Sequence, residues 1–394
     1  MILSSQAVAE DSPQKGVQKV RVLHLSPGKL YGGVETALVS LARFRHLCPG
    51  MEPHFGVCFA GRLSDELTAA GVRVHLLGEV RLGRPWTVWL ARRRLRKVLS
   101  QERYDAVVCH MPWPMVVFGS TARSSSRLIF WGHSSYNGRD WLERLARRVL
   151  PDLAVSSSRF VQPSIGTLYP GVDTRVIYCP VPLIELEDAP HWRSKVRREL
   201  GVDDDTVVII QLSRYEPYKG HLLHLEALSR LQTASKWVCW MIGGAQNAGN
   251  QAHYEEVRRA TERLGLTDRV RFLGERSDVT HLLAASDIFC QPNEGPEPFG
   301  IVFVEALWAG LPVVTTAMGG GVEIVDESCG LLAEPGNAGH LAGLLERLIG
   351  SSDLRARLGQ AGPARARQLC EPGSQLNELH GLLQQSIVKR TQVA

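Results

Sequence analysis

Short apolar runs alternate with amphipathic segments along the first 180 residues. The amphipathic segments repeat apolar residues every three or four positions, which is typical of a helix with one buried face. Strands that alternate with helices favour a parallel sheet covered by helices on both faces. The predicted strands are 20–26, 55–59, 72–77, 106–109, 128–131 and 153–155, and the predicted helices are 35–43, 62–70 and 86–99.

The same alternation restarts after the proline-rich segment 179–190, which we interpret as an interdomain linker. The expected strands are then 207–212, 237–242, 270–273, 288–291 and 312–315, with helices at 221–231, 301–309 and 375–387. The sequence therefore predicts an α/β protein with two Rossmann-like domains and a ligand cleft between them. The expected division is a flexible N-terminal tail, 1–18, a first domain, 19–180, a second domain, 181–372, and a C-terminal helix within 373–394 that packs back across the hinge.

The composition fits a globular protein, with 44% hydrophobic and 22% charged residues among 394. No apolar run reaches the roughly 18 residues that a membrane-spanning helix needs, and the polar start does not resemble a signal peptide, so we expect a cytoplasmic protein. The eight cysteines form no C-x-x-C motif and no His/Cys cluster. Buried free thiols are therefore expected rather than a disulfide framework or a zinc site.

Charge divides the chain, with a net of +11 over residues 1–180 and −6 over residues 181–394. The predicted helix at Trp86–Lys97 mixes tryptophan with five basic residues, and Trp141–Arg148 has a similar character. Such a surface could contact the inner face of an anionic membrane or an anionic lipid-linked acceptor, or it could be a solvated cationic helix face. No nucleic-acid recognition module is visible, so nucleic acid is not an expected partner.

The segment 294–312 is the most informative for chemistry, because it follows a strand and opens a helix. The backbone N–H groups of Gly300, Ile301 and Val302 would face outward at the positive end of that helix, which suits a diphosphate. Glu305 lies one turn further on among apolar residues, where an unpaired carboxylate is costly. Glu297 precedes the helix at the cleft. The alternative is an ordinary surface helix with solvated acids.

Six other loops that follow predicted strands carry candidate ligands. Arg214 and Lys219 could stabilise charge on a departing diphosphate, or could simply be exposed cations. The Gly32-Gly33 loop lets backbone approach a ligand but is not a dinucleotide fingerprint, so NAD binding is disfavoured. Further candidates are Gly243 in a glycine turn, Arg276 in a later loop, and the histidines His133 and, with less support, His110.

These motifs resemble those of the retaining GT-B glycosyltransferases of the GT4 family. The matches are the E-x7-E pattern of Glu297 and Glu305 with Phe299-Gly300 between them, the Arg214…Lys219-Gly pattern, and the Gly32-Gly33-x-Glu35 loop. Ser213 replaces the glycine that usually precedes the arginine. The resemblance covers about residues 20–370 and is strongest in the second half.

The resemblance implies a deep cleft, with the acceptor on the first domain and a nucleotide-diphosphate sugar on the second. It implies that Glu305 holds the ribose, that Glu297 and His133 frame the donor sugar, and that Arg214 and Lys219 act on the diphosphate. Gly32, Gly33, Gly243, Arg276, Phe299, Gly300, Ile301 and Val302 would complete the donor site. The expected reaction is retaining hexosyl transfer to a glycan, a lipid-linked or a small hydroxyl acceptor in cell-surface polysaccharide or glycolipid synthesis, with no cofactor and no metal. The alternatives are a nucleotide-sugar 2-epimerase-like isomerase and a non-catalytic nucleotide-sugar-binding protein.

Overall fold

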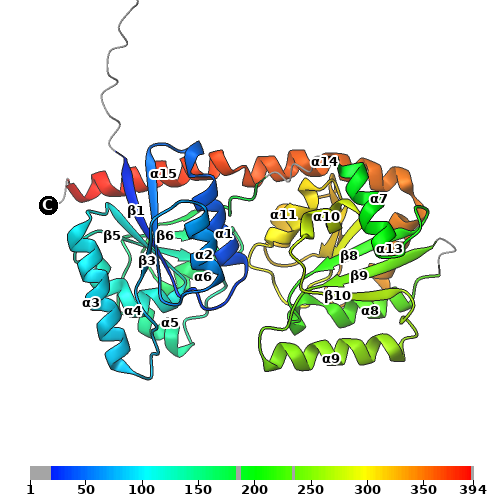
Figure 1. Cartoon of the computed structure of the whole chain (residues 1–394), viewed down its shortest axis with the longest axis horizontal. Helices are drawn as coiled ribbons and strands as arrows, with labels where there is room; N and C mark the ends of the chain where they lie inside the picture. The colour runs from blue at the N-terminus through cyan, green and yellow to red at the C-terminus, as the bar shows by residue number, and fades with distance from the viewer. Residues whose placement is uncertain (1–18, 183–187, 233–235, 392–394) are drawn as a thin grey trace, which may run out of the picture.

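The computed structural model describes residues 19–182, 188–232 and 236–391, so the tail expected at 1–18 lies outside the described residues. Two parallel sheets form two domains that lie side by side (Figure 1). All eight cysteines are buried and free, as expected from their scatter along the chain. Among the described residues, no helix combines the length and the apolar character needed to cross a bilayer.

The first sheet has seven parallel strands in the order β3-β2-β1-β4-β5-β6-β7. Two apolar cores lie on its opposite faces, because each strand alternates its side chains between them. The strands are β1 (Val20–Ser26), β2 (Met51–Val57), β3 (Val74–Leu76), β4 (Ala106–His110), β5 (Arg127–Gly132), β6 (Leu153–Ser156) and β7 (Thr174–Val176). The helices are α1 (Gly33–Arg43), α2 (Arg62–Ala69), α3 (Pro85–Gln101), α4 (Pro112–Arg123), α5 (Trp141–Ala146) and α6 (Gln162–Leu168), with a 3-10 turn, η1, at Arg45–Leu47.

The second sheet has six parallel strands in the order β10-β9-β8-β11-β12-β13. The strands are β8 (Val207–Leu212), β9 (Trp237–Ile242), β10 (Val270–Gly274), β11 (Ile288–Gln291), β12 (Val313–Thr316) and β13 (Gly330–Ala333). The helices are α7 (Ala189–Glu199), α8 (His221–Ser229), α9 (Ala248–Arg263), α10 (Val279–Ala284), α11 (Ile301–Trp308), α12 (Gly321–Ile324), α13 (Ala338–Gly350) and α14 (Ser352–Cys370), with a 3-10 turn, η2, at Pro217–Lys219.

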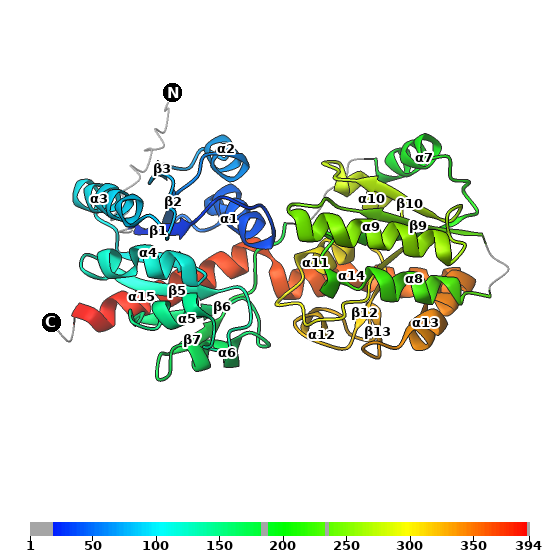
Figure 2. The ribbon, with the colours of Figure 1, turned by 90° about the horizontal axis from the view of Figure 1, so that it is seen from below.

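Helix α15 (Pro372–Thr391) leaves the second domain and returns along the first (Figures 1 and 2). Its Leu376, Leu379 and Leu383 are fully buried in a core of the first domain. Arg127 Nε on β5 also donates to Ser386 Oγ at 3.1 Å. The C-terminal segment of the chain is therefore part of the first domain's core.

The contacts between the domains are polar as well as apolar. Glu323 of α12 accepts hydrogen bonds from the backbone N–H groups of Arg159 and Phe160 at 2.9 and 2.7 Å and from the Tyr178 hydroxyl at 2.9 Å. Ser158 Oγ donates to the Pro298 carbonyl at 2.6 Å. These bonds fix the carboxyl ends of the two sheets in facing positions.

Two element predictions were wrong in ways that have physical causes. The second strand begins at Met51 rather than at residue 55; its first residues pair with β1 alone, and proline, here Pro53, is tolerated where a strand is not fully paired. The expected linker is shorter than 179–190, because Ala189-Pro190 opens α7, where proline suits the first helical turn. Residues 183–187 of that segment lie outside the described part of the chain.

Candidate active site

A cavity of about 510 Å³ lies between the domains and is lined by loops at the carboxyl ends of the strands. The first domain contributes the loops after β1, β4, β5 and β6, and the second domain those after β8, β9, β10 and β11. The weaker candidate His110 does not line this cavity, but the other residues proposed for the site from the sequence do: Gly32, Gly33, His133, Arg214, Lys219, Gly243, Arg276, Glu297, Phe299, Gly300, Ile301, Val302 and Glu305.

Lys219 and Glu297 form an ion pair inside the cavity, with Lys219 Nζ bonded to Glu297 Oε2. Each side chain is only 11% exposed. Burial alone lowers the pKa of Lys219, but the Glu297 carboxylate outweighs this and leaves the pKa raised, so Lys219 carries a full positive charge at neutral pH. Glu297 is therefore held by this cation and is not free in the cavity.

Arg214 lies at the mouth of the same cavity, between the two domains. Its guanidinium pairs with Glu216 at 3.2 Å and remains about one third exposed. A Cβ atom built on Gly32 would lie 3.9 Å from that guanidinium, which shows how closely the two loops approach. Gln246 Nε2 donates across the cleft to the Tyr31 carbonyl at 3.0 Å. A ligand in the cavity would therefore contact both domains at once.

Helix α11 opens toward the cavity with its first turn. Gly300 is its N-terminal cap residue, with a φ of 100° and no side chain to cap the helix. A Cβ at this position would come within 2.4 Å of the Phe303 ring, so the tight entry requires glycine. The first N–H groups of a helix have no intrahelical partner and carry partial positive charge. An anion placed here would face backbone donors as well as Lys219.

Glu305 lies one turn inside α11 and lines the cavity. Desolvation raises the pKa of this carboxyl to about 7. At neutral pH it is therefore poised between its charged and neutral forms, and hydroxyl donors from a ligand would favour the charged form. Such a group suits recognition of neighbouring sugar hydroxyls.

The N-terminus of α1 faces the same space from the first domain. Glu35 Oε2 accepts the Gly32 N–H at 3.0 Å, which holds the glycine loop against the helix. A Cβ built on Gly33 would lie 3.8 Å from Ile301 Cδ1, so the beginnings of α1 and α11 lie close together. Two helix N-termini thus add positive potential to one cavity.

Two predicted donor-site residues have structural partners of their own. Arg276 makes two hydrogen bonds to Asp278, at 2.7 and 2.6 Å, so its charge is largely committed within its loop. Phe299 is 4% exposed, and its ring stacks on Tyr178 with centroids 5.4 Å apart. Phe299 therefore packs at the hinge, and its loop rather than its ring would approach a ligand.

Three histidines form a hydrogen-bonded chain that ends at the cavity. His24 Nδ1 lies 3.0 Å from His110 Nε2, and His110 Nδ1 lies 2.9 Å from His133 Nε2. Burial lowers the pKa of His24 and of His133 to about 3 and holds that of His110 well below its usual range, so all three rings are neutral at pH 7. The rings of His110, Trp131 and His133 stack against one another, with centroids 5.2 to 5.5 Å apart.

The hydrogen-bond chain selects one tautomer for each ring. His24 Nε2 is buried without a partner among the described residues. A buried N–H without an acceptor is rarer than a buried acceptor without a donor, so His24 carries its proton on Nδ1. His24 then donates to His110, His110 donates to His133, and His133 keeps its own proton on Nδ1. His133 would thus offer the cavity a neutral N–H donor rather than a base.

Sequence reasoning named His133 and, as a weaker candidate, His110, but it missed His24. His24 lies on β1 within the run Val22-Leu23-His24-Leu25, and it is 1% exposed. A polar ring at a fully buried strand position was the available signal, because such a group needs a hydrogen-bond partner.

We expect His110→Phe to lower kcat roughly tenfold, the worth of about one hydrogen bond, and to lower thermal stability as well, because His24 and His133 each lose a buried hydrogen-bond partner. Phenylalanine keeps the stacked ring but cannot fix the tautomer of His133. Steady-state kinetics would measure the loss, and ¹⁵N NMR of the imidazoles would report the tautomer. A wild-type His133 that carries its proton on Nε2 would contradict this interpretation.

Comparison with known proteins agrees with this geometry. The model described as Glycosyltransferase Family 4 matches residues 31–184, and the model described as Glycosyl transferases group 1 matches residues 193–365. Phosphatidyl-myo-inositol mannosyltransferase from Mycobacterium leprae is 31% identical over 296 residues, which are 70% of this chain and 72% of that protein. The chain belongs to glycosyltransferase family 4.

Other members of the family are similar over most of the chain. Human alpha-1,3/1,6-mannosyltransferase is 26% identical over 312 residues, which are 72% of this glycosyltransferase and 73% of the human protein. The crystal structure of HepE from Anabaena with UDP and glucose has a TM-score of 0.81 and 25% identity, and the match covers 93% of this chain and 100% of HepE. The GT-B fold and the family expected from the motifs are thus confirmed.

As a member of this family, the protein is a glycosyltransferase that moves a sugar from a nucleotide sugar to an acceptor. Its two domains place the candidate site residues on facing loops of one cavity.

Proposed function

We propose that the protein transfers a hexosyl group from a nucleoside-diphosphate hexose to a hydroxyl acceptor with retention of anomeric configuration, in synthesis of a cell-surface polysaccharide or glycolipid. The observation that carries this proposal is the convergence of Lys219, Arg214 and the uncapped N-terminus of α11 on one cavity with Glu305. Relatives named as mannosyltransferases, and HepE with UDP and glucose, support a hexose donor.

In the proposed donor complex, the diphosphate lies against the first turn of α11, between Lys219 and Arg214. The ribose hydroxyls donate to Glu305. The hexose lies toward the first domain, where Glu297 and the His133 N–H orient its hydroxyls. This arrangement uses each charged group for a complementary part of the ligand.

In the proposed reaction, the bond between the anomeric carbon and the β-phosphate oxygen breaks as the acceptor oxygen bonds to the same face of that carbon. The acceptor proton passes to the departing β-phosphate oxygen, so the products are a nucleoside diphosphate and a glycoside. Lys219, Arg214 and the α11 amides stabilise the charge that grows on the diphosphate. These cations supply the charge that a metal ion would otherwise supply, so we propose that catalysis requires none.

Product analysis with a panel of UDP-, GDP- and ADP-hexoses tests the function. Thermal shift selects the donor, because a ligand that binds only the native state raises its stability. NMR of the product made with a hydroxyl acceptor then gives the anomeric configuration, with excess EDTA present. Retention is expected. An inverted product would overturn the retaining mechanism, and a requirement for metal would overturn metal-independent catalysis. Isomerisation of the donor without transfer would overturn the transferase function.

We further propose that α3 contacts an anionic membrane. Trp86 and Trp89 are 60% and 54% exposed and lie three residues apart on a helix face that continues to the exposed Arg93 and Lys97. Trp141 of α5, a helix that packs on α4 as α3 does, is 53% exposed. Arginine and tryptophan together suit the boundary between lipid headgroups and acyl chains.

We expect the double variant Trp86→Ser, Trp89→Ser to bind phosphatidylglycerol vesicles roughly tenfold more weakly than the wild type, because two exposed aromatic anchors are lost. Cosedimentation measures the binding, and added salt should weaken the wild type as well. Leu47→Ser, which changes a 39% exposed leucine elsewhere, is the matched control. Equal binding by all three proteins would contradict the proposal.

A further inference from the structure

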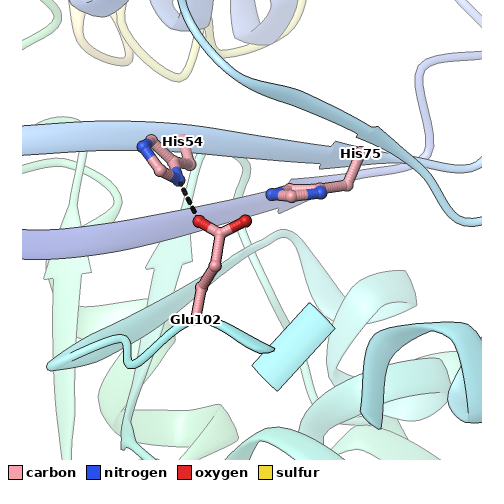
Figure 3. Close-up of side chains that lie close together, drawn as sticks. All are labelled: His54, His75 and Glu102. Carbon is pink, nitrogen blue, oxygen red and sulfur yellow. Dashed lines mark ion pairs between the residues drawn. The ribbon is translucent and has the colours of Figure 1, made fainter. Parts of the chain in front are cut away.

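A cluster of metal-ligating side chains lies in the first domain, away from the cleft. His54 projects from β2, His75 from the neighbouring edge strand β3, and Glu102 from the end of α3, and the three side chains point toward one another (Figure 3). One ligand atom from each lies within 4.8 Å of the other two. The residues that line the cavity beside this cluster are all different from those of the active-site cavity.

The Tyr104 hydroxyl completes a four-cornered arrangement. It lies 2.8 Å from His54 Nδ1, 2.9 Å from His75 Nε2 and 3.2 Å from Glu102 Oε2. The separation of His54 Nδ1 from Glu102 Oε2 is 3.4 Å. Ligands at the usual bond lengths around a tetrahedral zinc ion lie about 3.3 Å apart, so small shifts would bring these four atoms to zinc-binding positions.

The surrounding groups orient the ligands as they do in metal centres. His54 Nε2 lies 3.2 Å from Glu52 Oε1, so the carboxylate holds the proton on Nε2 and leaves the Nδ1 lone pair toward the cluster. Arg21 binds the other oxygen of Glu52 at 3.2 Å. Arg73 binds Glu102 Oε1 at 2.8 Å, which turns Glu102 Oε2 toward the histidines. Both arginines are thus paired with carboxylates.

An ion could reach the cluster from solvent. A cavity of about 710 Å³ opens beside it and is lined by His54 and Glu102. The same cavity is lined by basic residues, among them Lys19 and Arg45, which would weaken the binding of any cation held by charge alone. The site therefore depends on coordination by nitrogen lone pairs, which favours zinc over magnesium or calcium.

We propose that His54, His75 and Glu102 bind one Zn²⁺ ion, with the Tyr104 oxygen as the fourth ligand. The ion joins the short edge strand β3 to β2 and to the end of α3. It is a structural site, because it shares no lining residue with the cleft in which sugar transfer takes place. The absence of a closely spaced His/Cys motif hid this site, because its ligands come from three separate elements.

The test uses the full chain with its affinity tag removed and its metal stripped by dialysis against a chelator. We expect isothermal titration with ZnCl₂ to give one ion per chain and the unfolding midpoint to rise by several degrees, since the ion binds only the folded state. Cobalt(II) should give the intense visible bands of a four-coordinate site. Magnesium should neither bind in the titration nor raise the unfolding midpoint.

His75→Ala should abolish stoichiometric zinc binding and the zinc-dependent rise in midpoint. His46→Ala is the matched control, because His46 lines the same cavity but lies outside the cluster. Tyr104→Phe should weaken zinc binding at least tenfold. Sugar transfer by the stripped wild type should persist.

A stripped wild type that binds no zinc, or a His75→Ala variant that binds it as the wild type does, would leave only a hydrogen-bonded cluster and overturn the proposal. If His75→Ala does not fold, the stoichiometry and the cobalt spectrum of the wild type decide the question. A six-coordinate cobalt spectrum would overturn it too.

Discussion

Replacing Lys219 with methionine is expected to lower kcat/KM roughly 10²–10³-fold, the cost of removing one preorganised group that stabilises developing charge. The loss should fall on kcat as well as on donor binding, because the charge on the diphosphate grows as the glycosidic bond breaks. Steady-state kinetics with a saturating acceptor would separate the two. Lys236→Met, which changes an exposed lysine 62% accessible to solvent, is the control and should remain fully active.

The same substitution should destabilise the fold. Glu297 is only 11% exposed and would lose its cation. A buried charge that loses its partner costs about 3–5 kcal/mol. Adding Glu297→Gln to Lys219→Met should recover much of that stability without recovering activity. Near-normal kinetics in the single variant, or a double variant no more stable than the single, would contradict the role given to this pair.

Glu305→Gln is expected to reduce kcat/KM about a hundredfold or more while making the protein more stable at high pH. The loss follows because each hydrogen bond that a carboxylate accepts from a hydroxyl contributes about 1.5–3 kcal/mol, and a neutral amide is a weaker acceptor. Exposed Glu334→Gln is the matched control. Kinetics within a few-fold of the wild type would exclude ribose binding by Glu305.

The stability change has a definite sign. The pKa of Glu305 in the folded protein is about 7, above the unfolded value of 4.5. The folded state therefore holds this proton more tightly, and the advantage is complete below pH 4.5 and lost as the pH rises through 7. At pH 8 the ionised group costs up to about 3 kcal/mol, at about 1.4 kcal/mol per pH unit, and glutamine removes that cost. Unfolding midpoints at pH 8 and pH 5 test this, and a gain that does not shrink at pH 5 would contradict it.

The same pKa predicts how pH affects the donor. If the bound ribose favours ionised Glu305, binding releases a proton, and donor affinity weakens as the pH falls below about 7. Calorimetry in buffers of different ionisation enthalpy would count the proton.

Sequence patterns predicted the two sheets well because a buried parallel strand reads as a continuous apolar run. They did not predict α7 at the hinge, because proline is common both in linkers and in the first turn of a helix. Only the structure shows that Ala189-Pro190 begins a helix. The cleft residues follow strand ends, and the carboxyl ends of parallel strands meet at one edge, so motifs far apart in the chain could be placed in one site.

Contacts that depend on strand register could not be predicted from the sequence. Gly56 of β2 pairs with His75 of β3, which brings His54 and His75 to neighbouring strands. Neither residue has a local signal for this pairing. His24 meets His110 for the same reason, because β1 and β4 are adjacent although 79 residues of chain, holding two other strands, separate them in sequence. Hydrogen-bond chains and metal clusters of this kind require the folded arrangement.

Leu376, Leu379 and Leu383 of α15 fill the core of the first domain, yet they follow the whole second domain in the chain. A ribosome therefore makes the first domain's sheet long before it makes the helix that covers it. Until residues 372–391 emerge, the nascent first domain carries an apolar hollow that chaperones or misfolded partners could occupy. The second domain is thus made before the helix that completes the first, and separating the two domains at the hinge would leave the first without the part of its core that α15 supplies.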